Sequence, residues 1–150
     1  MKATKLDTQI DEAYRATTYR VLVAGEDAID LRIGERSHAL ESLLSQNACD
    51  SWAFITACNP ASQPLPAEEN ASRQAELVRV LRGRGWRFFQ GMGMPADSTW
   101  QPEASVLVLG ISREDAVEIA KRFGQNAIVV GQRAGAAELV YCVCPTGEAP

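Results

Sequence analysis

The segment that most restricts the fold is a short apolar run that stops in a proline-rich stretch. Residues 52–57 (WAFITA) contain a single polar side chain, so both faces of the strand that they form are expected to be covered. Residues 59–66 hold three prolines, and proline lacks the N–H group that the interior of a helix or strand needs. The sequence therefore predicts a central strand of a sheet at 52–57, followed directly by an irregular loop.

Length and composition indicate one soluble globular domain. The 150 residues are 46% hydrophobic and 23% charged, which fits a single core over residues 1–150 with a loose tail at 145–150. No apolar run approaches the roughly 20 residues that span a bilayer, so no membrane partner is expected. Acidic residues interrupt the first 15 positions, which excludes a signal peptide. We therefore expect a cytoplasmic location and reduced cysteines.

Hydrophobic periodicity and capping residues predict alternating helices and strands. Helices are expected over 7–17, 38–46, 68–81 and 113–123. Strands are expected over 19–23, 28–33, 52–57, 86–90, 104–109, 127–130 and 138–143, with a loop at 91–101. Hairpins near both ends, joined through helical crossovers, predict an α+β fold. The expected architecture is a mixed β-sheet flanked by about four helices in a single-domain sandwich.

Polar residues gather where the strand 52–57 ends. In open α/β sheets, ligands bind in the crevice beyond the carboxyl ends of the strands. If the central strands run parallel, Ser112 lies at the same edge of the sheet as this cluster. Pro60 is expected to hold Asn59 in extended backbone. The residues expected to bind a ligand there are Thr56, Asn59, Ser62, Asn70, Arg73 and Gln125.

Each of these residues has both a functional and a structural interpretation. Asn59 and Ser62 would orient a ligand by hydrogen bonds, although both residue types also stabilise turns and helix caps. Arg73 would meet an anionic group, for which the guanidinium fork is suited. Glu103 precedes an apolar strand, where partial burial would raise its pKa, and it is the candidate catalytic acid or base. The structural alternative is an exposed or arginine-paired glutamate.

Known catalytic and metal motifs are not found. His38 is the only histidine, and no GxSxG nucleophile motif accompanies it. The spacing of Cys142 and Cys144 is not the CxxC of structural zinc sites. Cys58 has no sequence neighbour that would lower its pKa, so a packing role is favoured. The glycines at 91–95 match no phosphate-binding loop. No metal site is expected, and no cofactor is assigned.

A basic segment supports a second hypothesis. Between residues 70 and 90 there are five arginines and one glutamate, in a chain whose net charge is −4. Arginines interleaved with aromatic residues can hold single-stranded nucleic acid. The Arg-rich 73–87 face would then bind nucleic acid or an acidic partner, whereas a solvated helix end beside core aromatics is the structural alternative. A packing subunit without a ligand is a third interpretation.

Four motifs together resemble a bacterial family. They are WAFITAxNPxS at 52–62, ENxxR at 69–73, WxPExS at 100–105 and FGQNA at 123–127. The chain resembles the family known as domain of unknown function 3293 from about residue 19 to about residue 140. The resemblance implies a small cytosolic bacterial domain without established activity, with a polar pocket shared by the family. An aromatic residue often stands at the position of Cys58 in this family, which argues against an essential thiol.

Overall fold

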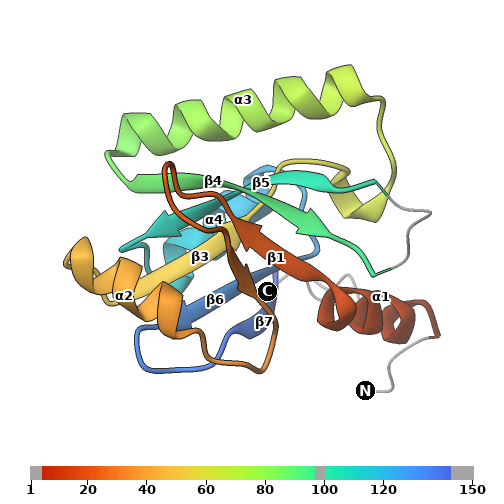
Figure 1. Ribbon diagram of the computed structural model, residues 1–150. Helices are drawn as coiled ribbons and strands as arrows, with labels where there is room; N and C mark the ends of the chain where they lie inside the picture. The colour runs from red at the N-terminus through yellow and green to blue at the C-terminus, as the bar shows by residue number, and fades with distance from the viewer. Residues whose placement is uncertain (1–4, 97–100, 143–150) are drawn as a thin grey trace.

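The computed structural model describes residues 5–96 and 101–142 (Figure 1). The helices are α1 (Lys5–Ala16), α2 (His38–Gln46), α3 (Ala67–Arg84) and α4 (Arg113–Arg122), with a 3-10 turn η1 (Pro60–Ser62). The strands are β1 (Thr18–Val21), β2 (Ile29–Leu31), β3 (Ser51–Ile55), β4 (Arg87–Met94), β5 (Glu103–Leu109), β6 (Ala127–Gln132) and β7 (Glu138–Tyr141). The predicted order of helices and strands is confirmed. The predicted tail at 145–150 lies outside the described residues.

The strands form one seven-stranded sheet in the order β2-β1-β4-β5-β3-β6-β7. Every ladder between these strands is antiparallel, which corrects the expectation of a mixed sheet. The crossovers explain the difference. The chain leaves β3 through α3 and returns two places away in β4, and β5 then fills the place between them, antiparallel to both. In the same way, α4 carries the chain from β5 to β6 on the other side of β3.

The sheet curls, and helices cover both of its faces. An isolated parallel bridge between Ile33 and Ala137 joins the segments beside the two edge strands. One core lies under α3 and α4 and includes Leu77, Leu81, Ile119, Ala53, Ile55 and Val108. The other lies under α2 and includes Leu40, Leu43, Leu44, Trp52, Phe54 and Leu107. Because β3 contributes side chains to both cores, its predicted central position is confirmed, as is the α+β class.

Two elements continue well past their predicted ends. β4 continues to Met94, so the predicted loop at 91–101 is shorter at its start. α3 continues to Arg84 and ends at Gly85, whose φ of 78° is the left-handed conformation that favours glycine at a helix end. Within residues 5–96 and 101–142, no helix combines the length and apolar character needed to cross a membrane.

The antiparallel order decides which segments meet beyond the end of β3. Ile55 pairs with Val106 and Phe54 pairs with Val129, so the end of β3 lies beside the starts of β5 and β6. The start of β1 lies at the same end of the sheet, because Thr18 pairs with Met94 at the end of β4. Ser112 lies near the opposite edge instead, since the preceding turn bonds to Ser51 through Gly110.

Candidate functional site

The segment at residues 56–62, which follows β3 and includes the start of the proline-rich loop, has an unusual backbone. Asn59 adopts φ 48° and ψ 61°, and Ala61 and Ser62 have φ values of 55° and 61°. The left-handed region costs an L-residue roughly 1–2 kcal/mol. The expectation that Asn59 is extended is therefore wrong. Asparagine tolerates this region better than most residues, and its side-chain hydrogen bonds outweigh the preference that Pro60 imposes.

The Asn59 side chain connects three parts of the molecule. Its Oδ1 accepts hydrogen bonds from the Leu65 backbone N–H at 2.9 Å and from Asn70 Nδ2 at 2.8 Å. Its Nδ2 donates to Glu103 Oε2 at 2.8 Å. The Asn59 backbone N–H donates in turn to Asn70 Oδ1 at 2.9 Å. The two asparagines thus bind each other reciprocally, and Asn59 links α3 and the loop to β5.

Two further side chains fix the same segment to the end of α4. Arg73 donates through Nε to the Ala57 carbonyl at 2.7 Å and through Nη2 to the Phe123 carbonyl. Gln125 Nε2 donates to the Cys58 carbonyl at 3.0 Å and to the Phe123 carbonyl at 3.4 Å. Phe123 is the C-cap of α4, where free carbonyls favour a cation. Both side chains therefore satisfy backbone groups.

The two hydroxyl residues of the segment have different surroundings. Thr56 Oγ1 donates to the Ala104 carbonyl at 2.7 Å and accepts from the Cys58 N–H at 3.0 Å. Ser62 Oγ accepts from Asn126 Nδ2 at 2.9 Å and lies near the hydroxyl of Tyr14, whose pKa it lowers. The Thr56 hydroxyl thus bonds to backbone groups. The Ser62 side chain is exposed, and its hydroxyl bonds to a side chain.

All seven residues that the sequence singled out meet at this segment. Three lie in it, and the side chains of the other four bond to it: Thr56, Asn59 and Ser62, and then Asn70, Arg73, Glu103 and Gln125. Sequence reasoning thus located one connected polar site. A ligand-binding or catalytic role for these residues remains a prediction.

Glu103 is the titratable residue at the centre of the site. Its side chain is half-buried, and burial raises its pKa above the ordinary value of 4.5, while the hydrogen bond from Asn59 lowers it. None of the ion pairs among the described residues includes Glu103. Burial also raises the pKa of the Cys58 thiol, and Cys58 is 5% exposed. This environment agrees with the predicted packing role of Cys58.

Sequence reasoning missed two residues of this site. Tyr14, from α1, lies near Ser62 and the backbone of Ala127, which lower the pKa of its hydroxyl, but burial raises this pKa to about 12. Gln74 is 8% exposed, and its Oε1 accepts from the Ala57 N–H at 3.1 Å. Both residues occupy ordinary helical positions in the sequence. No local pattern identifies them, because their partners are distant along the chain.

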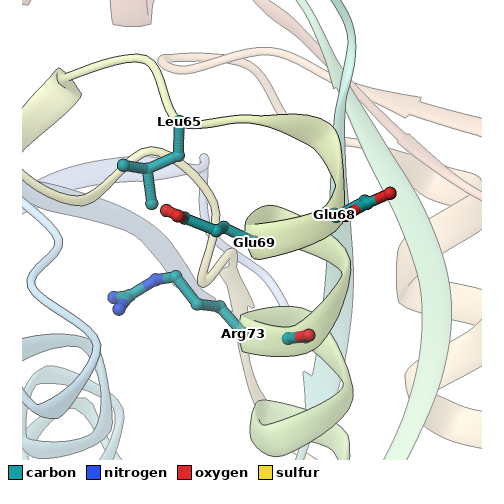
Figure 2. Close-up of a pocket in the computed structure, with 5 residues that line it drawn as sticks. Leu65, Glu68, Glu69 and Arg73 are labelled. Carbon is teal, nitrogen blue, oxygen red and sulfur yellow. The ribbon is translucent and has the colours of Figure 1, made fainter.

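A shallow depression of about 470 Å³ lies beside Arg73. It is lined by Leu65, Glu68, Glu69, Ser72 and Arg73. Figure 2 shows the Glu69 and Arg73 side chains extending from the same side of α3, below Leu65. This depression is a poor place for an anion. The carboxylates of Glu68 and Glu69 repel negative charge, and the Arg73 guanidinium already donates to two backbone carbonyls.

The arginines of the basic segment are engaged in different contacts. Arg79 pairs with Glu76, and Arg87 donates to Asn47. Two guanidinium groups lie over aromatic rings of β4 or the residue before it: Arg82 over Phe88 at 5.8 Å, and Arg84 over Trp86 at 5.3 Å. Both rings also pack against the core under α3. These aromatic residues are therefore not arranged as a free stacking surface for bases.

No metal centre is found in the described part of the chain. Residues 5–96 and 101–142 contain no group of three histidine, cysteine or acidic side chains that could hold an ion. Cys142 is buried, and burial raises the pKa of its thiol to about 11. Cys144 lies outside the described residues, so the structure does not place the pair together.

Substitution of Asn59 separates its side-chain bonds from its backbone conformation. Asn59→Ala removes three side-chain hydrogen bonds and puts a Cβ-bearing residue without them at positive φ, so we expect a loss of roughly 2–4 kcal/mol in unfolding free energy. Asn59→Gly removes the same bonds but accepts the backbone, and should be less destabilised by roughly 0.5–1 kcal/mol. Urea denaturation measures both. Two variants as stable as the wild type would contradict this role.

The raised pKa of Glu103 predicts a dependence of stability on pH. Just above pH 4.5, the Glu103 carboxyl keeps its proton in the folded state, whereas the same carboxyl in the unfolded chain has released it. The associated stability is complete below that value and is lost as the pH rises through the folded pKa. Glu103→Gln cannot ionise, so its unfolding free energy should increase relative to the wild type between about pH 4 and pH 7. Glu26→Gln, at an exposed turn, is the matched control, and an identical profile for both variants would exclude a buried carboxylate.

Comparisons with known proteins place the site inside a recognised family segment. Residues 55–128 match the model of the family described as Protein of unknown function (DUF3293). The match runs from the end of β3 to the start of β6, a shorter span than the expected 19–140. No curated protein and no solved structure shows significant similarity to the chain. Through residues 55–128, which hold Asn59, Arg73 and Glu103, the chain belongs to the DUF3293 family of proteins of unknown function.

Proposed function

We propose that this protein binds a small polar ligand at the end of the sheet where β3 stops and β5 begins. The Glu103 carboxyl and the Ser62 hydroxyl would contact this ligand. The observation that carries the proposal is the state of Glu103. Its carboxyl group is half-buried and receives one hydrogen bond, from Asn59, without a cationic partner among the described ion pairs. Removing a carboxylate from water without a counter-charge is unfavourable. Such groups are enriched at functional sites.

The ligand should carry hydrogen-bond donors, such as an amine or several hydroxyl groups. A carboxylate accepts hydrogen bonds and attracts cations, and Glu103 has acceptor capacity beyond the single bond from Asn59. The anion that the sequence suggested depends on Arg73, whose guanidinium bonds to the carbonyls of Ala57 and Phe123. Of the two ligand classes, the neutral or cationic one has the better chemical support.

The site is built to hold Glu103 in one position. Asn59 fixes the carboxylate, and the reciprocal bonds between Asn59 and Asn70 fix Asn59 itself. Left-handed, non-glycine backbone at three of four consecutive positions is a form of local strain that clusters at ligand sites. Glu103 is also our candidate for proton transfer if the ligand is a substrate. From the sequence, we place this activity in the bacterial cytoplasm.

A screen of small molecules by thermal shift tests the proposal. The panel contains primary amines, amino acids and neutral sugars, with phosphates and dicarboxylates as the contrasting class. A ligand at 100 times its Kd adds about 2.7 kcal/mol of stability. For a domain of this size that is a rise in Tm of about 5–10 °C. We expect the response from a donor-bearing compound.

Matched variants connect a response to the site. Glu103→Gln should abolish or strongly reduce the shift, because the neutral amide replaces an acceptor oxygen with an NH₂ group. Glu26→Gln should keep it, because this turn is remote from the β3 end. An unchanged response in Glu103→Gln, or responses confined to phosphates and dicarboxylates, would overturn the proposal.

A further inference from the structure

We propose that α1 is a displaceable cover over the Glu103 site, and that a ligand reaches this site when α1 moves away. This inference rests on the proposed function for its biological meaning, but the motion itself is measured without a ligand. The argument uses the position of α1, the contacts that hold it and the side chain that it inserts.

The position of α1 follows from the topology. Its last residue, Ala16, lies two residues before β1, which starts at the edge where β3 ends and β5 begins. Figure 1 shows α1 beside this edge, away from the faces that α2 and α3 cover. The helix therefore lies next to the polar site and outside the two packed layers of the fold.

Tyr14 reaches from α1 into the site. Its hydroxyl lies close enough to Ser62 and to the backbone of Ala127 for both to lower its pKa, and the charge of Glu103 raises that pKa. A second tyrosine secures the same turn, since the Tyr19 hydroxyl donates to the Tyr14 carbonyl at 2.8 Å. The phenol of Tyr14 thus lies at the polar site, near the Ser62 hydroxyl that the proposed ligand would contact.

Over residues 8–16, polar contacts rather than core packing hold the rest of α1. None of residues 8–16 is buried, and none belongs to either hydrophobic core. On the side of β7, the Tyr141 hydroxyl donates to Asp11 Oδ1 at 2.6 Å. Arg32 Nη2 donates to the Arg15 carbonyl at 3.4 Å. Elements with few buried apolar contacts open at lower free energy than the core, and a 12-residue helix is marginal by itself.

Two measurements on the full chain test this inference. Amide hydrogen exchange reports the opening of α1, and labelling with a carbodiimide and glycine ethyl ester reports the accessibility of the Glu103 carboxyl. In the wild type, Glu103 should label more slowly than exposed Glu26. Residues 8–16 should exchange faster than β3, because they open without global unfolding.

Tyr141→Phe removes one contact of α1 without touching Glu103. We expect both α1 exchange and Glu103 labelling to increase by roughly 2- to 10-fold, the effect of losing one hydrogen bond. Tyr14→Ala removes the inserted ring and should increase both rates further. Glu138→Gln is the control on the same strand, since it breaks the pair with Arg113 and leaves α1 untouched. Exchange in β3 should be unchanged in Tyr141→Phe.

Three results would overturn the inference. They are Glu103 labelling as fast as Glu26 in the wild type, exchange of α1 only together with β3, and faster α1 exchange in both tyrosine variants without faster Glu103 labelling. Failure of the proposed function gives a different pattern. In that case no compound of the screen binds, yet Glu103 labelling still follows the opening of α1.

Discussion

The hydrogen bonds of the Asn59 side chain are the interaction on which the rest of the site depends. One amide group accepts from the loop and from α3 and donates to β5, so three separate elements are held at fixed distances. These bonds help to offset the cost of the left-handed backbone at Asn59, Ala61 and Ser62. The position of Glu103 depends on the same group, because Asn59 provides its hydrogen bond from within the protein. The hydrogen bonds of Asn59 therefore support both the structure of the site and its proposed function.

The sheet topology is the second requirement. Because β3 lies between β5 and β6 and runs antiparallel to both, its end meets their beginnings. Glu103 at the start of β5 and Gln125 before β6 thus reach a loop that is distant along the chain. In a parallel arrangement, Glu103 and Gln125 would lie at the opposite end of the strands, away from the end of β3. The order and the direction of the strands position the site, and the side chains then fix its details.

Much of this could be predicted from the sequence, for identifiable reasons. Apolar runs and caps gave the order of helices and strands, and the unbroken apolar character of 52–57 indicated a central strand. Polar residues next to those runs turned out to form one site, since element ends meet at sheet edges. The antiparallel pairing was missed because it depends on which gap a strand fills. The conformation of Asn59 was missed because distant hydrogen bonds overrode the local effect of Pro60. Tyr14 carries no local signal at all.

A double-mutant cycle between Asn59→Gly and Glu103→Ala tests the central claim most directly. The cycle compares the unfolding free energies of both single variants, the double variant and the wild type. If the Asn59 amide couples the loop to β5 through Glu103, the two substitutions should interact by about 0.5–3 kcal/mol. Additivity within about 0.5 kcal/mol would contradict the account, because it would mean that the two residues stabilise the fold independently.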